Sequence, residues 1–453
     1  MEQNEYYETS APCARTYTNA QKWLLLAALV IGIVFDRLII NRILNAGSVN
    51  EFAPYYGAFW LIYILAFYSL TWKTSSKKTD AWILLGAVAL LFLRYAVYEQ
   101  QYLGFINLLV IPCLLMLHCA AGVYDVQKGK ETRYFGLFFA GWFIRPFSAF
   151  GHFVSALASA LSGGKGSVSR KILLGLLAAV PVAAVVIALL INADEVMSFY
   201  GAKIFGDFNA AEFIIHSFIA LIAAVLFYSF LYNAAWGKHE LKQSGNRLRI
   251  DRVGASVVLI VLIIAYAVFA YVQFAYLFGL KGLPDGLTYS EYARKGFTEL
   301  LWVASINLIV FAAFVNCTES TPLFKALLFS LLGFTLVVLF SGIVRLLMYI
   351  GAYNLTMMRI LPMWFMIFLV FAVLLCAVKL IEAKTKLVRI LFISLLVWYI
   401  ALNAVNLDAV IAKSIIANAP GGVVSENDKN YILYSLSSDA DAVREQYREK
   451  LMP

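Results

Sequence analysis

Three arginines lie inside long apolar runs, where a charge is costly unless another group receives it. They are Arg37 in "IVFDRLII", Arg94 in "LFLRYAVYEQQYL" and Arg345 in "LVVLFSGIVRLLMYIGAY". Tyr98 follows Arg94 by four residues and Tyr349 follows Arg345 by four, which puts each pair on one face of a helix. Because a guanidinium binds oxyanions through its planar fork, this pattern predicts an anion site lined by arginine and tyrosine.

A second interpretation of these arginines needs no ligand. Each one can reach the lipid headgroups or pair with an acid on the same side of the membrane. On the first interpretation, Ser341, one helical turn before Arg345, also belongs to the expected ligand-binding residues. The acids expected nearby are Asp36, Glu99, Asp194, Glu195 and Glu291. The sequence leaves both interpretations open.

The elements that must position these residues are membrane-spanning helices. Of the 453 residues, 62% are hydrophobic and 14% are charged, whereas soluble domains carry roughly 25% charged residues. The apolar runs reach about 17 residues or more, the length that crosses ~30 Å of hydrocarbon. We therefore expect an all-α, polytopic membrane protein with about eleven transmembrane helices (ten to twelve). The expected spans are 23–40, 55–71, 81–98, 105–123, 172–192, 213–235, 253–279, 300–315, 326–349, 362–378 and 387–403.

The distribution of lysine and arginine predicts how these spans are oriented. With the N-terminus in the cytoplasm, the inner segments carry most of the 36 basic residues, and the outer segments and the tail carry most of the 27 acids. The positive-inside rule therefore favours a cytoplasmic N-terminus and an extracytoplasmic C-terminus. Because the basic residues are scattered over many loops, the net charge of +9 does not indicate nucleic-acid binding. The expected partner is the lipid bilayer.

Two regions differ from simple spans. The stretch 134–161 has aromatic residues at helical spacing, and one crossing there would invert every later loop. We expect an amphipathic elbow on the cytoplasmic face, bent at Pro146, with a re-entrant hairpin as the alternative. In the tail we expect two short helices, with Ser438 capping the second. The expected regions are an N-terminal segment (1–22), a four-helix membrane region (23–133), the elbow and linker (134–171), a seven-helix membrane region (172–403) and the helical tail (404–453).

Other polar residues in the spans indicate weaker sites. His118 lies between Cys113 and Cys119, but this spacing does not bring all three into line for a metal. His216 and Asn307 are expected to form hydrogen bonds between helices, with a proton relay as the alternative. The sequence holds no nucleotide-binding, metalloprotease or serine-hydrolase motif. We therefore expect no catalytic residue, metal or cofactor.

Several blocks of the C-terminal two thirds, taken in order, resemble a known family. They include "SEYARKGFTELLWVASINL" (290–308), "RLLMYIGAYNLTMMRILPMWFM" (345–366) and "NLDAVIAKSIIANA…DKNYILYSLSSDA" (406–440). These blocks are similar to a bacterial multi-spanning membrane family known as domain of unknown function 4173, which is related to domain 4153. The resemblance implies a multi-pass protein of the bacterial cytoplasmic membrane. It implies no mechanism, because the family has no assigned activity.

Three classes of function remain. The preferred one is binding or transport of an anionic or amphipathic solute or lipid, through an outward-facing site made by the arginines and tyrosines. The second is a sensory or regulatory membrane protein that acts through a protein partner. The third is an enzyme that acts on a lipid-linked substrate at the outer face, where Asp36 supplies an acid.

Overall fold

The computed structural model describes residues 18–75, 78–123, 136, 139–161, 210–237, 250–276, 296–318 and 321–451. Within these ranges the chain forms α-helices and short 3-10 and π-helical turns, and no strand. Nine of the described helices are long and apolar enough to cross a membrane, and a bent helix pair makes a possible tenth. These helices confirm the expected all-α, polytopic membrane class.

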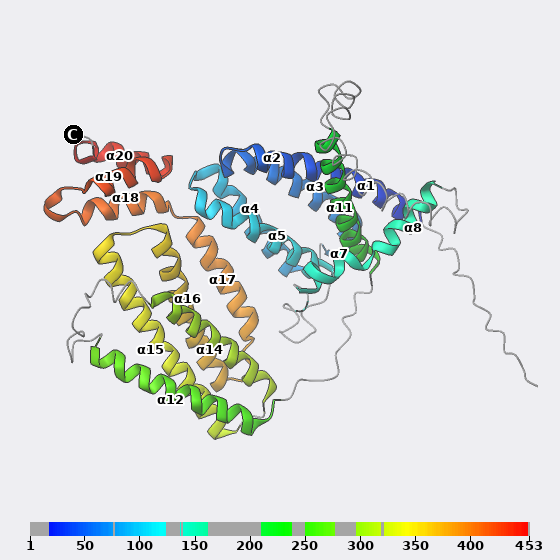
Figure 1. The fold of residues 1–453 in the computed structure, drawn as a ribbon. Helices are drawn as coiled ribbons and strands as arrows, with labels where there is room; N and C mark the ends of the chain where they lie inside the picture. Colours follow the sequence, from blue (N-terminus) through cyan, green and yellow to red (C-terminus); the bar gives the residue numbers. More distant parts are fainter. Residues whose placement is uncertain are drawn as a thin grey trace, which may run out of the picture. The chain divides into compact units, whose positions relative to one another are not determined.

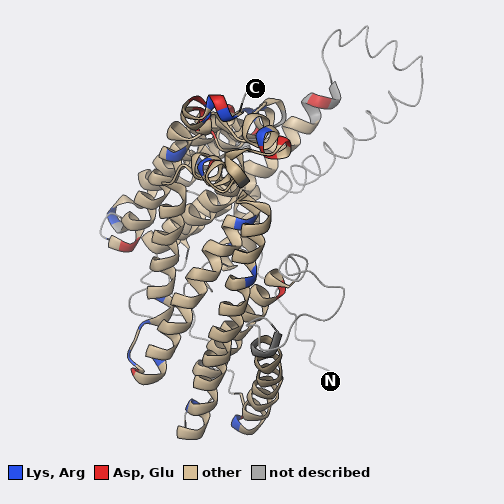
Figure 2. Cartoon of the chain, turned by 90° about the vertical axis from the view of Figure 1, so that its left-hand side faces the viewer, with Lys and Arg blue, Asp and Glu red and all other residues tan. Residues whose placement is uncertain are grey.

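Each expected span except 172–192, which lies outside the described residues, coincides with a helix. Some helices begin earlier than expected because a side chain caps them: Thr321 accepts a hydrogen bond from the backbone N–H of Phe324, so that helix begins at Pro322. The long helices are α1 (Asn19–Phe35), α3 (Val49–Ser75), α4 (Thr79–Val97), α5 (Gln101–Val123), α11 (Ala210–Trp236), α12 (Arg252–Tyr276), α14 (Phe297–Cys317), α15 (Pro322–Tyr353), α16 (Met357–Ile381) and α17 (Leu387–Asn403). Most of the coloured charged residues lie near the ends of the long helices (Figure 2), as is typical of membrane-spanning segments.

The chain divides into two compact units, which we describe separately. Unit 1 consists of Met1–Phe92 and Leu108–Leu241, and unit 2 consists of Leu93–Asn107 and Lys242–Pro453. In unit 1, α1 packs along α11 (Figure 1). The helix α1 continues into the π-helical turn η1 (Asp36–Ile40) and the short helix α2 (Asn41–Asn45).

The elbow in unit 1 is helical and is fixed to α11. It consists of η2 (Ala140–Ile144), α7 (Arg145–Ser148) and α8 (Phe150–Leu161). The chain turns at Ala149 and not at Pro146 as expected, because a proline is tolerated in the first turn of a helix. On α11, Ser229 Oγ accepts from the N–H of Ala149 (2.9 Å) and donates to the carbonyl of Arg145 (2.7 Å). These two hydrogen bonds satisfy the backbone where the elbow bends.

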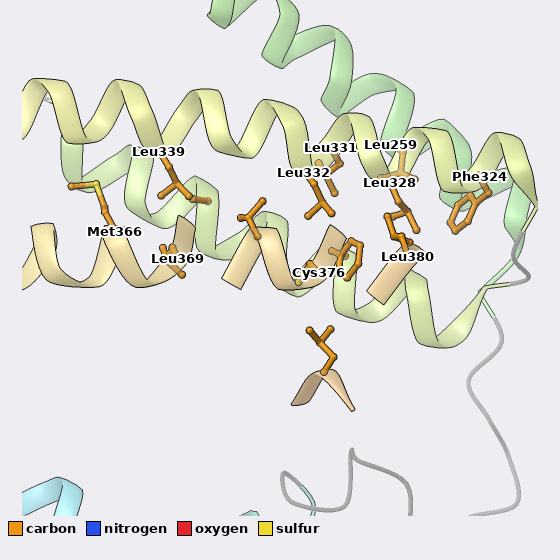
Figure 3. Close-up of a cluster of buried hydrophobic side chains, with 14 of the residues drawn as sticks. Leu259, Phe324, Leu328, Leu331, Leu332, Leu339, Met366, Leu369, Cys376 and Leu380 are labelled. Carbon is orange, nitrogen blue, oxygen red and sulfur yellow. The ribbon is translucent and has the colours of Figure 1, made fainter. Parts of the chain in front are cut away.

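In unit 2, α15 lies at the centre of a bundle with α12, α14 and α16. Its buried residues recur every three or four positions, which gives one continuous apolar stripe. Figure 3 shows Leu328, Leu332 and Leu339 of this stripe beside Leu369 and Cys376 of α16. The same stripe includes Ser341 and Arg345, both of which are buried. Packing of α15 therefore places a polar and a charged side chain inside the bundle.

The C-terminal tail of unit 2 has its own apolar core, to which the span ends contribute. Ile411, Ile415 and Ile432 pack with Leu103 of α5 and Met357 of α16. The expected second tail helix is instead three short pieces, and it is Ser437, not Ser438, that caps the first of them, by accepting from the N–H of Asp439 (3.3 Å). The elements are α18 (Leu407–Ala417), η3 (Pro420–Gly422), α19 (Glu426–Asn430), η4 (Tyr431–Ser435), η5 (Ser438–Ala440), α20 (Asp441–Gln446) and α21 (Arg448–Leu451).

Candidate functional site

Arg37 belongs to unit 1 and is the exposed member of the three arginines. Its side chain is 61% exposed, and its Nε lies 3.9 Å from a carboxylate oxygen of Asp36. An exposed ion pair of this kind contributes little to stability. Asp36 itself is buried, and its nearer partner is the Nδ1 atom of His216 at 2.6 Å.

Arg345 belongs to unit 2 and is buried, with 8% of its surface exposed. Its Nη2 donates to the amide oxygen of Gln273 (3.0 Å), and Ser341 Oγ donates to the same oxygen (2.7 Å). Gly296 has φ +97°, and a Cβ atom there would lie 2.5 Å from Arg345 Nη1, so a glycine is needed to admit the guanidinium. Tyr349, which we expected beside Arg345, lies under Arg359, with 4.2 Å from the guanidinium carbon to the ring centre.

Arg94 also belongs to unit 2 and is 5% exposed. Its Nη2 donates to both the backbone oxygen (3.0 Å) and the side-chain oxygen (2.7 Å) of Gln100. The hydroxyl of Tyr98 donates to the carbonyl of Ala404 (2.9 Å). Tyr98 and Tyr349 therefore each contact a group other than the arginine that lies one helical turn earlier on the same helix. The glutamines that receive the two arginines, Gln100 and Gln273, were missed from the sequence, although each is a polar residue in or beside an apolar span.

Hydrogen bonds to acids connect the C-terminal tail to the segment between α4 and α5. The carboxylate of Asp439 accepts from the backbone N–H groups of Glu99 and Gln100 (2.9 Å each). The carboxylate of Glu99 in turn accepts from Ser438 Oγ (2.5 Å). Asp408 is buried and accepts from the N–H (2.9 Å) and hydroxyl (2.6 Å) of Ser437. Of the acids expected near the arginines, Asp194, Glu195 and Glu291 lie outside the described residues.

A pocket of about 770 Å³ opens between these segments of unit 2. Its polar side is formed by carboxylates and hydroxyls, and its apolar side includes Phe105 of α5 and Met358 of α16, both exposed. The lining residues are Glu99, Gln100, Gln101, Tyr102, Phe105, Thr356, Met357, Met358, Asp408, Tyr431, Ser435, Leu436, Ser437 and Ser438. We call this the tail pocket.

The electrostatics of the tail pocket differ from those of the anion site expected from the sequence. The ionisable side chains at its wall are the acids Glu99 and Asp408 and the phenols of Tyr102 and Tyr431. Burial raises the pKa of Tyr431, the Asp408 carboxylate raises this pKa further and Arg359 lowers it, so the hydroxyl is protonated near neutral pH and can donate a hydrogen bond. Arg94 does not line the pocket; it holds Gln100, which does. The arrangement can therefore bind a hydrogen-bond donor or a cation.

Two of the weaker candidates from the sequence, Asn307 and His118, have structural roles. Asn307 accepts from Tyr266 of α12 (2.6 Å) and donates to Thr335 of α15 (3.0 Å), which confirms the expected hydrogen bonds between helices. The Nδ1 atom of His118 lies 2.7 Å from the carbonyl oxygen of Ala81, so this ring is committed to a backbone group. In the described part of the chain, no group of three or more histidines, cysteines and acids is placed to hold a metal ion.

Comparison with known proteins identifies a family. The model of a family described as "Domain of unknown function (DUF4153)" matches residues 84–447. This is the relative of the domain 4173 family that the sequence blocks resemble, and its match begins well before those blocks. No curated protein and no solved structure matches the chain.

Proposed function

The chain belongs to the family of domain of unknown function 4153, and from this premise we propose that it is a membrane protein that binds an amphipathic molecule in the tail pocket. The head of this molecule carries a positive charge or donates hydrogen bonds. The observation that carries the proposal is the composition of the pocket wall, which joins acids and hydroxyls on one side to exposed apolar side chains on the other.

The apolar side supports a ligand with a hydrocarbon part. Phe105 and Met358 come from membrane-spanning helices and are both exposed and part of the pocket wall. A hydrocarbon chain that lies along these residues stays in an apolar environment while its head enters the pocket. On the orientation expected from the charge distribution, this pocket faces the extracytoplasmic side.

The polar side supports a head that donates. The Glu99 and Asp408 carboxylates already accept from serines, and each has remaining lone pairs. A second anion beside them would be repelled, whereas an ammonium or hydroxyl group would add favourable hydrogen bonds. We therefore favour an amphipathic ligand over the anionic one that the arginines predict.

A regulatory role is the second candidate, and the contacts of Asp439 favour it. This carboxylate caps the backbone at the start of α5 from a position 340 residues away in the sequence. A ligand head bound next to Glu99 and Ser438 changes the surroundings of this contact, so occupancy can alter how firmly the tail is held. A partner protein that reads the tail would complete such a sensor.

The test uses three amphiphiles with the same ten-carbon chain and different heads: decylammonium, decanoate and decyl glucoside. Thermal unfolding of the purified protein in lipid nanodiscs measures binding as a ligand-dependent rise in the midpoint. We expect decylammonium to stabilise most and decanoate least. Glu99→Gln should weaken decylammonium binding about tenfold, or about 1.4 kcal/mol.

The matched control is Glu445→Gln, which removes an exposed acid of the same tail away from the pocket wall. Its affinity for decylammonium should equal that of the wild type. Tighter binding of decanoate than of decylammonium would reject the tail pocket as the binding site for a cationic head. It would favour the anion site that the arginines predict. Equal loss of affinity in Glu445→Gln and Glu99→Gln would show that decylammonium responds to overall charge alone.

A further inference from the structure

A buried acid and a histidine face each other inside unit 1, which contains none of the residues that line the tail pocket. Asp36 lies at the start of the π-helical turn η1, and His216 lies on α11. His216 Nδ1 is 2.6 Å from Asp36 Oδ1, and both residues belong to helices apolar enough to span a membrane. Since a carboxylate oxygen accepts, Nδ1 carries the hydrogen of this bond.

Close contact between the two helices fixes the geometry of the pair. Gly32 precedes Asp36 by one helical turn, and Ala220 follows His216 by one turn. A Cβ atom at position 32 would lie 2.2 Å from the carbonyl oxygen of Ala220, so the two backbones approach as closely as a glycine allows. The π-helical turn then redirects the chain from Asp36 onward, and such turns are frequent at functional sites.

Exposure to water decreases stepwise along three neighbouring side chains at this pair. The Asp36 side chain is 4% exposed, that of His216 is 13% exposed and that of Glu212 is 61% exposed. Glu212, one turn before His216 on α11, has its carboxylate 3.9 Å from the second ring nitrogen, Nε2. The order from solvent to interior is therefore Glu212, His216, Asp36.

Other charged and titratable groups lie on the described elements that pack against the pair. Arg37 on η1 lies 3.9 Å from the second oxygen of Asp36. On α3, which packs against η1, Glu51 accepts from the backbone of Gly47, Tyr55 lies under Arg42, and Tyr56 donates to a backbone carbonyl. On α8, which packs against α1 and α11, His152 stacks on Tyr232, four turns along α11 from His216.

We propose that Asp36 and His216 form a proton-binding site within the membrane-spanning part of unit 1. A proton from solvent reaches Nε2 past the Glu212 carboxylate and binds there, while the Nδ1 hydrogen stays on its bond to Asp36. The neutral ring becomes an imidazolium, and the pair changes from one negative charge to none. A change of charge at a buried site alters its hydration, so this site can couple proton uptake to a rearrangement of α1 against α11.

The alternative is a purely structural pair that keeps one protonation state. The two are distinguished by nuclear magnetic resonance of protein labelled with ¹⁵N at its histidines and reconstituted in nanodiscs. The chain has four histidines, and His216→Gln identifies the signals of this residue. We expect the His216 ring to change from imidazolium to the neutral form with Nδ1–H as the pH is raised.

Variants then assign the effect to the acid. In Asp36→Asn the ratio of imidazolium to neutral ring at a fixed pH should fall about tenfold or more, because an acid at hydrogen-bond distance is lost. Glu212→Gln should lower the ratio less, since its carboxylate is farther away and exposed. His118, whose ring faces the carbonyl of Ala81, supplies an internal control that should keep one form throughout.

Two results would overturn the proposal. The first is a His216 ring that keeps one protonation state across the whole pH range in the wild type. The second is an Asp36→Asn protein that titrates like the wild type. If Asp36→Asn does not fold, the wild-type titration and the Glu212→Gln variant still decide between a proton-binding site and a structural pair.

Discussion

The buried Asp36 of unit 1 and the two buried arginines of unit 2 are received by different kinds of side chain. In unit 1 the buried Asp36 faces His216, a group that can change its own charge. In unit 2 the buried Arg94 and Arg345 donate to glutamines, whose charge is fixed at zero. A titratable receiver lets a site exchange protons with solvent, whereas an amide receiver anchors a permanent cation. The comparison contrasts a pair in unit 1 that can change its charge with two arginines in unit 2 that keep theirs.

The largest expected effect tests the helix contact that holds the pair in unit 1. Gly32→Ala should lower the free energy of unfolding by about 3 kcal/mol or more, because the new methyl group meets the backbone of α11. Gly86→Ala on α4 is the control, since a Cβ atom there meets nothing within 4 Å. Unfolding in mixed micelles of increasing denaturing detergent measures both. Similar stability of the two variants would show that α1 and α11 can separate freely.

Substitution of Gln273, which accepts a hydrogen bond from Arg345, should have the next largest effect on stability. Gln273→Leu should destabilise the protein by about 2 kcal/mol, because a hydrogen bond to a buried charge is lost. Gln273→Glu replaces the amide receiver in unit 2 by a titratable one, the kind found in unit 1, and should retain most of the stability. The same detergent titration separates these variants. If Gln273→Leu is as stable as the wild type, the amide does not anchor the arginine.

A smaller and local effect is expected where the tail is fastened. Asp439→Ala removes the acceptor for the backbone N–H groups of Glu99 and Gln100, at a cost of about 1 kcal/mol. Hydrogen–deuterium exchange should rise in residues 98–104 and in the tail, and stay unchanged in α12 and α14. Uniform acceleration across unit 2 would mean that the tail and the bundle open together.

The smallest effect is expected at the exposed arginine. Arg37→Gln should change the free energy of unfolding by less than about 0.5 kcal/mol, because its ion pair with Asp36 is long and the arginine side chain is exposed. A thermal scan beside the Gln273→Leu variant measures the contrast between the units. A loss as large as that of Gln273→Leu would show that Arg37 is as important as the buried arginines.

The membrane class and the helix positions could be read from the sequence, because the length and composition of apolar runs report directly on the bilayer. The partners of Arg94 and Arg345 could not. Spacing along one helix places Tyr349 on the face of Arg345 but carries no information on α12, which supplies Gln273. The Asp36–His216 contact and the tail pocket join segments far apart in the chain, so they depend on how the helices pack.

The contact between Asp439 and the start of α5 also orders events during synthesis. Leu93–Asn107 belongs to unit 2 but leaves the ribosome long before the rest of that unit. The 340 residues between Glu99 and Asp439 take roughly 20 to 70 seconds to translate. Throughout that interval the backbone at the start of α5 lacks its final acceptor, and Leu103 lacks the apolar neighbours that the tail provides. A chain that is truncated before residue 406 would therefore present an unfinished surface, which quality-control proteases can recognise.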